Sequence, residues 1–195
     1  MTYSIIGSGK VGTALARQFA RNGIPVAIAN TRDPISLAPL INELGNTVTA
    51  QPLEQALEAD IVILAIPFGA HREIGQRFAN WKNRIVIDAM NTYGVPPQEL
   101  GDRASTDVVA TAFVGARVVK TFNQLPAALL AKDPANDGGR QVMFVWSRNQ
   151  EANTTVTQLV DQLGFAPISL GEIDEGGKLL GLGGPLILQN IIKYQ

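Results

Sequence analysis

The glycines at positions 7, 9 and 12 are the residues of this chain whose spacing carries the clearest chemical meaning. They belong to the run Gly7-Ser8-Gly9-Lys10-Val11-Gly12, which follows a short apolar segment and precedes an amphipathic one. Between a strand and a helix, the first glycine of such a run forms a tight turn, the second lets a pyrophosphate approach the backbone, and the third lets the helix pack on the sheet. The unpaired N–H groups of the helix N-terminus favour phosphate. The run therefore predicts a dinucleotide-binding loop.

A second chemical signal follows the next apolar segment, residues 24–29, where Asn30, Thr31 and Arg32 come in succession. Enzymes that use NAD place Asp or Glu at this point against the ribose 2′-hydroxyl, and a carboxylate would repel a 2′-phosphate. Arg32 can instead pair with that phosphate through two hydrogen bonds, and Thr31 can donate to it. We therefore expect NADP rather than NAD. The alternative is that Arg32 is a solvated loop residue ahead of a helix.

Length and composition limit the classes of function. The chain has 195 residues, a formal net charge of −1, no cysteine and a single histidine, His71. These features exclude disulfides and a cysteine nucleophile, and they argue against a metal site and a nucleic-acid partner. No apolar run reaches the ~18 residues that cross a bilayer, and the N-terminus is itself a predicted strand, so we expect a cytoplasmic protein without a membrane span or signal peptide.

Strand and helix patterns alternate along the first 123 residues. Apolar runs predict strands at residues 3–6, 24–29, 47–49, 61–66, 85–88 and 118–122. Helical patterns predict helices at residues 13–20, 34–44, 52–59, about 70–81 and 105–113. After residue 123 we expect a helix at 126–132, a strand at 141–146, a helix at 150–163, a strand at 165–170 and a terminal helix within the apolar segment 178–194.

These patterns predict one α/β domain over residues 1–195, with a core at about 1–123 and an extension at about 124–195. The fold class is Rossmann-type, with a doubly wound, mainly parallel sheet, two extra C-terminal strands and a terminal helix. Because an apolar terminal segment usually needs a partner, we expect a homodimer formed through residues 178–194, and the alternative is that this segment forms a wall of the substrate pocket.

Several blocks of the sequence match a known family. They are the glycine run, Thr31-Arg32-Asp33-Pro34, Leu64-Ala65-Ile66-Pro67-Phe68, Ile85-Val86-Ile87-Asp88 with Asn91, and Gly115-Ala116-Arg117-Val118-Val119-Lys120-Thr121-Phe122-Asn123. On these blocks the chain resembles, nearly end to end, the coenzyme F420-dependent NADP oxidoreductases. It is similar also to the cytosolic NADPH-binding domain of the six-transmembrane metalloreductases. The block that ends in Asn123 is the most specific of these matches.

The resemblance implies hydride transfer between NADPH and a flat acceptor such as F420, FMN or FAD, with little need for acid–base groups. It implies that residues 7–11 hold the pyrophosphate, that Asn91 lies near the nicotinamide, and that residues 120–123 line the cleft. The catalytic candidates are Asn91, Lys120 and Asn123. The candidate cofactor-binding residues are Gly7, Ser8, Gly9, Lys10, Val11, Gly12, Asn30, Thr31, Arg32, Ala65, Ile66, Pro67, Phe68, His71 and Asn91.

Three titratable residues have two interpretations each. Lys120 is expected in the cleft or beside a phosphate, and the alternative is a structural lysine paired with a carboxylate. His71 is expected to be an exposed helix residue, and the alternative is a contact with the cofactor or acceptor. Asp88 is expected to order the turn that follows its strand rather than to act as an acid.

The sequence also departs from the family pattern. No second basic residue follows Arg32, because Ile35-Ser36-Leu37 occupies that stretch, and Asn91-Thr92 replaces Asn-Pro. A β-hydroxyacid dehydrogenase or imine reductase is the alternative enzyme, but those enzymes have a long helical C-terminal half, and Ile187 stands where the hydroxyacid group has its lysine. The alternative outside catalysis is an NADPH-sensing module, which would share the glycine run and Arg32 but needs no open slot beside the nicotinamide.

Overall fold

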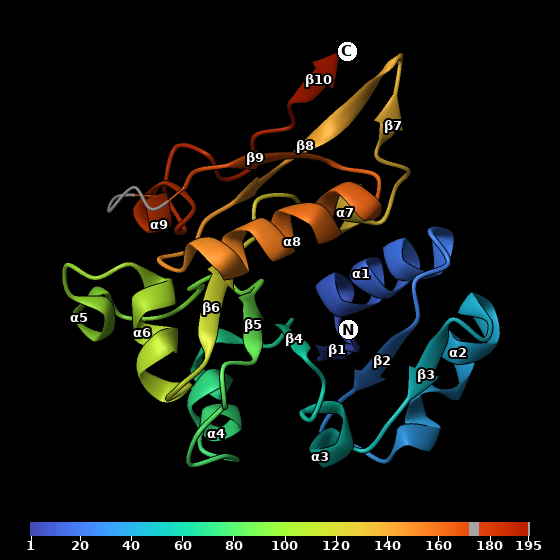
Figure 1. The fold of residues 1–195 in the computed structure, drawn as a ribbon, viewed down its shortest axis with the longest axis horizontal. Coiled ribbons are helices and arrows are strands. Elements are labelled where there is room, and N and C mark those ends of the chain that lie inside the picture. The colour runs from blue at the N-terminus through green and yellow to red at the C-terminus, as the bar shows by residue number, and fades with distance from the viewer. Residues whose placement is uncertain (172–175, 195) are drawn as a thin grey trace.

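The computed structural model describes residues 1–171 and 176–194, and a six-stranded parallel sheet forms its centre (Figure 1). The strands are β1 (Tyr3–Ile6), β2 (Val26–Ala29), β3 (Val48–Ala50), β4 (Ile61–Leu64), β5 (Ile85–Asp88) and β6 (Arg117–Lys120). Their order in the sheet is β3-β2-β1-β4-β5-β6. The order reverses between β1 and β4, and open sheets of this kind bind ligands beside that point, at the carboxyl ends of the strands.

Helices cover both faces of this sheet, which explains why every residue of β2, β4 and β5 is buried. One face packs against α1 (Lys10–Arg21), α7 (Ala127–Leu130) and α8 (Gln150–Gln162). The other face packs against α3 (Leu53–Ala56), α4 (His71–Gly75) and α6 (Ser105–Ala112). The remaining connections contain η1 (Pro34–Leu37), α2 (Ala38–Leu44), η2 (Phe68–Ala70) and α5 (Pro97–Leu100).

Beyond β6 the chain forms a second, smaller sheet. Its strands are β7 (Ala135–Asn136), β8 (Gly139–Val145), β9 (Ala166–Ser169) and β10 (Ile192–Tyr194). The central strand β8 is antiparallel to β7 and β10 and parallel to β9. The two sheets are linked because Lys120 and Trp146 exchange backbone hydrogen bonds with N···O distances of 2.7 and 3.0 Å. The short helix α9 (Gly176–Leu179) packs closely on Trp146, since a Cβ on Gly176 would lie 2.1 Å from the indole ring.

The doubly wound parallel fold expected from the sequence is confirmed, including both expected strands of the extension. Many element boundaries differ by a few residues, and two of these differences have a clear physical cause. The helix expected at about 70–81 ends at Gly75, which packs so closely on α6 that an added Cβ would lie 2.4 Å from the Ala112 carbonyl oxygen. Trp81 then turns back and donates its indole N–H to the Gly75 carbonyl at 2.9 Å. The strand expected at 118–122 ends at Lys120, because Phe122 has a φ of 62°.

The terminal helix expected within residues 178–194 is wrong. After α9 the described chain continues through turns and ends in the strand β10, which pairs with β8. Gly181, Gly183, Gly184 and Pro185 interrupt this segment, and such residues disfavour a helix. Together with the two-residue strand β7, this change gives the extension four strands instead of two.

Candidate nucleotide-binding site

The three glycines at the junction of β1 and α1 have different structural roles; Gly12 lies in the first turn of α1. Gly7 has a φ of 108°, and a Cβ there would lie 2.3 Å from the Ala65 carbonyl oxygen. A Cβ on Gly12 would lie 1.8 Å from the Gly7 carbonyl oxygen. At Gly9 a Cβ would meet nothing within 4 Å. The loop is therefore packed tightly at both ends, and open space lies at Gly9, where a phosphate would need close access to the backbone.

The N-terminus of α1 is suited to an anion. Gly9 is the N-cap residue, no side chain caps the helix, and its first turn has no acidic residue. Among the described residues, no acceptor atom forms a hydrogen bond with the backbone N–H of Gly9, Lys10 or Val11. The helix dipole and these free donors favour negative charge at this position, and the exposed Lys10 adds a positive charge.

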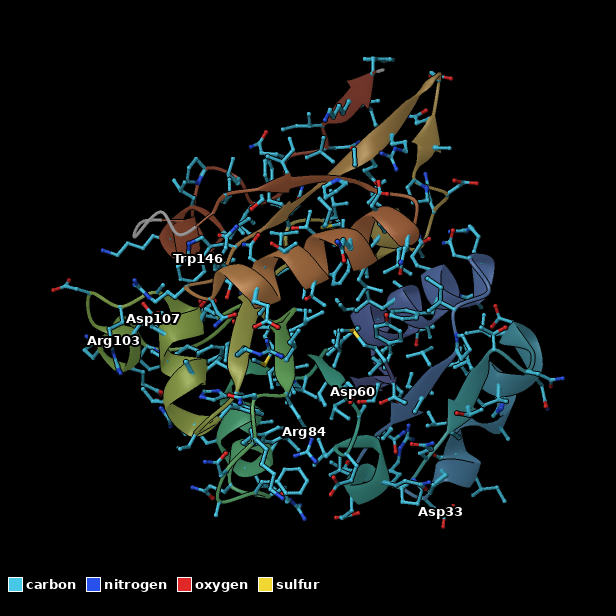
Figure 2. The ribbon with its side chains drawn as sticks, viewed as in Figure 1. Asp33, Asp60, Arg84, Arg103, Asp107 and Trp146 are labelled. Atoms are coloured by element: carbon cyan, nitrogen blue, oxygen red, sulfur yellow. The ribbon has the colours of Figure 1, made fainter. Side chains whose placement is uncertain are left out.

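Arg32 lies on the loop that follows β2 and is exposed. In the part of the chain that the structure describes, its guanidinium has no hydrogen bond or ion pair, whereas every other arginine there donates to a carboxylate or to another oxygen. The adjacent Asp33, labelled in Figure 2, forms no ion pair with it; its carboxylate accepts the Ile35 N–H at 2.8 Å and caps η1. The loop therefore presents a guanidinium whose N–H groups no described residue uses.

A cavity of about 260 Å³ adjoins the glycine run and the ends of β1, β2 and β4. The predicted cofactor residues that line it are Gly7, Ser8, Gly9, Asn30, Thr31, Ala65, Ile66 and Pro67. Ligand pockets typically enclose about 300–1,000 Å³, so this cavity suits part of a dinucleotide. Its apolar side, which includes Leu53, Pro67 and Ile74, suits the flat face of a purine.

Some residues of this cavity were not predicted from the sequence: Ile6, Leu53, Ala70, Glu73 and Ile74. A signal for three of them was present, because Ala70, Glu73 and Ile74 are spaced i, i+3 and i+4 directly after the turn at Pro67. Such spacing places side chains on one face of a helix. Glu73 is exposed and pairs with Arg77 at 2.9 Å, so its charge is partly balanced.

Seven predicted cofactor residues are not part of the wall of this cavity: Lys10, Val11, Gly12, Arg32, Phe68, His71 and Asn91. Phe68 is buried in the core between the sheet and α4. His71 was expected to be exposed, but it is 1 % exposed and its ring packs on Phe68. Its Nδ1 contacts the Phe68 carbonyl oxygen, its Nε2 has no partner among the described residues, and the hollow that it lines is a different one, beside Arg72.

Lys120 and Asp88 form an ion pair that is 0 % exposed at both residues. Lys120 Nζ donates to Asp88 Oδ2 at 3.0 Å and to the Met90 carbonyl oxygen at 2.6 Å, and Thr106 Oγ1 donates to the same carboxylate at 3.1 Å. The Met90 N–H donates to Asp88 Oδ1 at 3.0 Å, so the expectation that Asp88 orders the following turn is confirmed. The Lys120 ammonium is therefore enclosed and paired with a carboxylate, which is the alternative interpretation of this residue, rather than open to a cleft.

Asn91 and Asn123, which follow β5 and β6, form a reciprocal pair. Asn91 Nδ2 donates to the Asn123 carbonyl oxygen at 2.9 Å, and Asn123 Nδ2 donates to Asn91 Oδ1 at 3.0 Å. Asn123 Nδ2 also donates to the Leu180 carbonyl oxygen at 2.7 Å, which ties the C-terminal segment to this edge of the sheet. Asn123 is 4 % exposed, and its Oδ1 has no partner among the described residues. The pair stands at the same edge as the glycine run but outside the 260 Å³ cavity.

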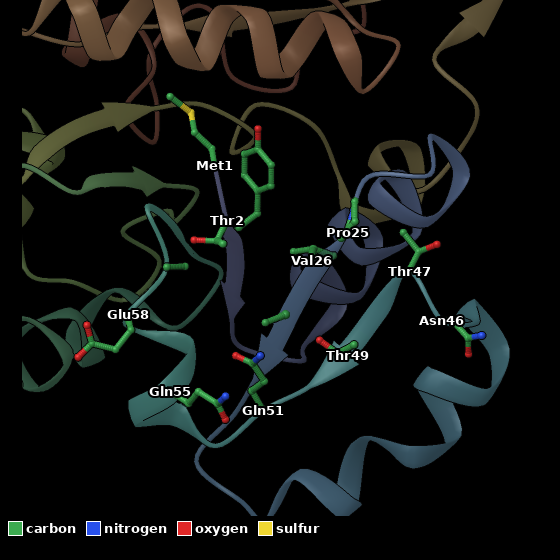
Figure 3. A pocket seen from close by; sticks show the side chains of 13 residues that line it. Met1, Thr2, Pro25, Val26, Asn46, Thr47, Thr49, Gln51, Gln55 and Glu58 are labelled. Carbon is green, nitrogen blue, oxygen red and sulfur yellow. The ribbon is translucent and has the colours of Figure 1, made fainter.

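A larger hollow of about 420 Å³ lies elsewhere, beside the residues that begin β1, β2 and β3 (Figure 3). It is lined by residues such as Thr2, Pro25 and Thr47, so it adjoins the amino ends of the strands. Ligands of open parallel sheets bind at the opposite edge, and we therefore place the candidate site at the smaller cavity.

Two residues with shifted pKa values, Asp60 and Tyr3, also lie at the amino edge of the sheet. Hydrogen bonds from the Thr2 backbone N–H, at 2.8 Å, and hydroxyl lower the pKa of Asp60. Burial and the nearby Asp60 charge raise the pKa of Tyr3. Among the described residues no group of three or more His, Cys, Asp and Glu side chains is placed to hold a metal ion, and no helix has the length and apolar character that crossing a membrane requires.

Comparison with known proteins agrees with this geometry. Residues 2–92 match the family described as NADP oxidoreductase, coenzyme F420-dependent. Metalloreductase STEAP3 of Rattus norvegicus is 30% identical over 171 residues, which cover 87% of this chain and 33% of that protein. The chain therefore spans about a third of the length of this relative.

Two solved structures share the fold over nearly the whole chain. A hypothetical protein, SMa0349, from Sinorhizobium meliloti is 42% identical with a TM-score of 0.94, over 99% of this chain and 96% of that one. A candidate F420-dependent NADP-reductase from Arthrobacter sp. FB24 is 24% identical with a TM-score of 0.74, over 99% of this chain and 100% of that one. The second similarity supports the fold alone, and the family match covers residues 2–92, which contain β1 to β5 of the parallel sheet.

Proposed function

We propose that this chain, whose residues 2–92 match the family of coenzyme F420-dependent NADP oxidoreductases, transfers a hydride ion between NADPH and a flavin or deazaflavin acceptor such as F420, FMN or FAD. The observation that carries the proposal is the guanidinium of Arg32, which forms no ion pair or hydrogen bond with the described residues, beside the carboxyl end of β2. An arginine at this point favours a 2′-phosphate over a 2′-hydroxyl because it can donate two parallel hydrogen bonds to a phosphate.

In this proposal the chain's own residues hold the two halves of NADPH. The free N–H groups at the start of α1 receive the pyrophosphate at Gly9, and Thr31 and Arg32 receive the 2′-phosphate. The cavity wall formed by Leu53, Pro67 and Ile74 receives the adenine. These roles require no movement of a buried side chain.

The hydride-transfer end lies beside Asn91 and Asn123. The nicotinamide supplies hydride when NADPH is bound, and such a transfer needs positioning more than it needs an acid or a base. Consistent with that, the ionisable pair nearest these asparagines in sequence, Asp88 and Lys120, is buried and mutually satisfied.

The test is oxidation of NADPH, followed by absorbance, with purified protein offered FMN, FAD, riboflavin, F420 and a ferric chelate in turn. Turnover with a flavin or with F420 supports the proposal and names the acceptor. Tight NADPH binding without turnover of any acceptor would favour an NADPH-sensing module. Turnover that requires a ketone or imine would favour a reductase of small organic substrates.

The proposal includes a homodimer formed through the C-terminal segment. Four large apolar side chains within it are exposed: Leu182, Leu188, Ile191 and Tyr194. The strand β10 is also at an edge of the second sheet. Light scattering on the wild type and on Ile191→Lys tests this, because a dimer through this surface would dissociate in the variant, whereas a monomeric wild type would exclude it.

A further inference from the structure

The side chain of Asn30 connects three segments that surround the candidate site. Its Nδ2 donates to Ser8 Oγ at 3.0 Å and to Ser36 Oγ at 3.3 Å, and its Oδ1 accepts the Arg32 N–H at 2.8 Å. These segments are the glycine run, the loop after β2 and the turn η1. Both amide hydrogens of Asn30 are used within the protein, so it has no donor left for a phosphate. Any effect of Asn30 on recognition of a phosphate must therefore pass through its neighbours.

This connection matters because recognition of the 2′-phosphate depends on few residues. No second basic residue follows Arg32 in the stretch Ile35-Ser36-Leu37. An exposed arginine on an unanchored loop loses backbone and side-chain entropy when it binds, which weakens the net interaction. The hydrogen bond from the Arg32 N–H to Asn30 holds the loop before the ligand arrives. The bond to Ser8 fixes that loop relative to the glycine run.

We propose that Asn30 is the positioning residue for NADP(H) selectivity. Its hydrogen bonds fix the Arg32 loop relative to the glycine run, so that the 2′-phosphate of a nucleotide can bind at Arg32 while its pyrophosphate binds at the glycine run. Because the Ser8 hydroxyl accepts from Asn30, its own hydrogen remains available to the cavity that Ser8 lines. The inference rests on the proposed function, since it takes Arg32 as the 2′-phosphate ligand.

The experiment compares dissociation constants for NADPH and NADH, measured by fluorescence titration without any acceptor. The variants are Arg32→Ala, Asn30→Ala and the double variant. We expect Arg32→Ala to lower the NADPH preference at least about tenfold, the scale of a charged hydrogen bond, and Asn30→Ala to lower it about fivefold. If Asn30 acts through Arg32, the double variant has the same preference as Arg32→Ala. Asn46→Ala, an exposed amide on the loop before β3, is the matched control and leaves the preference unchanged.

Separate outcomes overturn the inference and the proposed function. If Arg32→Ala lowers the preference while Asn30→Ala does not, or if the two losses add in the double variant, Asn30 does not position Arg32. If Arg32→Ala itself leaves the preference unchanged, the 2′-phosphate assignment fails. Melting temperature checks the fold of each protein. If Asn30→Ala does not fold, Ser36→Ala removes one anchor of the amide, and we expect about a twofold loss of preference; no loss there overturns the proposal.

Discussion

Gly9 and Gly12 are three residues apart, at the N-cap and in the first turn of α1, yet the space around them differs. A Cβ at Gly9 meets nothing within 4 Å, whereas one at Gly12 would lie 1.8 Å from the Gly7 carbonyl oxygen. The same residue type therefore keeps space for a ligand at one position and allows packing of α1 on the sheet at the other. Mutation separates the two roles.

We expect Gly9→Val to abolish nucleotide binding while the melting temperature stays near that of the wild type, because the isopropyl group fills the space at the helix N-terminus. Gly12→Ala should instead lower the free energy of unfolding by about 1–3 kcal/mol, as overpacking does. Calorimetry with and without NADPH measures both. Retained NADPH binding by Gly9→Val would show that this loop does not hold the pyrophosphate.

Arg32 is the residue on which cofactor choice should depend. Arg32→Ala removes charged hydrogen bonds to the 2′-phosphate, so we expect about 1.5–3 kcal/mol weaker NADPH binding and little change for NADH. Titration calorimetry with both nucleotides measures the difference, and Arg103→Ala, an exposed arginine near α5, is a control (Figure 2). Equal losses for NADPH and NADH would contradict the assignment.

At the scale of elements, the ends of β5 and β6 form a unit. The ion pair between Asp88 and Lys120 connects the two strands, and Lys120 also donates to the Met90 carbonyl oxygen. Three residues further along each segment, Asn91 and Asn123 form a second connection. Phe122, with its φ of 62°, turns the chain between Lys120 and Asn123. A positive φ at a buried aromatic residue needs support from surrounding contacts, and such conformations concentrate at functional sites.

Loss of Lys120 should therefore damage the fold. We expect Lys120→Met to lower the free energy of unfolding by about 3–5 kcal/mol, because it leaves a buried carboxylate without its counter-charge. The double variant Asp88→Asn/Lys120→Met should recover part of that loss. The exposed pair between Arg17 and Glu43 provides the control, since Arg17→Ala should cost less than about 1 kcal/mol. A Lys120→Met protein with the same free energy of unfolding as the wild type would show that the lysine does not stabilise the fold.

Asn91 should affect the rate more than the affinity. Replacing Asn91 with Ala removes both hydrogen bonds to Asn123 and loosens the edge where the nicotinamide is proposed to lie. We expect a lower hydride-transfer rate with NADPH affinity changed less than about threefold, since positioning errors reduce rate most strongly. Stopped-flow single-turnover measurements separate the two quantities. An unchanged rate would move the nicotinamide elsewhere.

The amino edge of the same sheet has a pH-dependent contact. Thr2 hydrogen bonds lower the pKa of Asp60 in the folded state below its ordinary value of 3.8, so the unfolded chain binds the proton more tightly. Asp60 therefore contributes stability above the ordinary pKa, and this contribution is lost as the pH falls through the folded-state pKa. Melting temperatures measured between about pH 6 and pH 2 should fall less steeply in Asp60→Asn than in the wild type. Identical slopes would contradict this role.

At the scale of the whole molecule, nucleotide binding and folding are linked. NADPH at a hundred times its Kd stabilises the folded state by about 2.7 kcal/mol, and for a chain of this size that should raise the melting temperature by about 5–10 °C. NADH at the same concentration should raise it less. Equal shifts at equal concentrations would contradict the preference for NADP.

The sequence by itself determined the glycine loop, the alternation of strands and helices in the sheet and the position of Arg32. These features follow from local rules: a turn that needs glycine, an apolar period, and a residue type at the end of a strand. The same local rules missed the wall formed by Glu73 and Ile74, and they predicted a helix where β10 pairs with β8, because that strand depends on a partner about fifty positions away in the sequence.

The tertiary structure decided which polar side chains are free and which are occupied. Asn30 meets Ser8 across 22 positions, Lys120 meets Asp88 across 32, and Asn123 meets the Leu180 carbonyl across 57. A side chain buried by such long-range pairing loses its access to ligand, which is why Lys120 is a structural residue although its sequence context favoured the cleft. Arg32 keeps its access because the described fold brings no carboxylate to it.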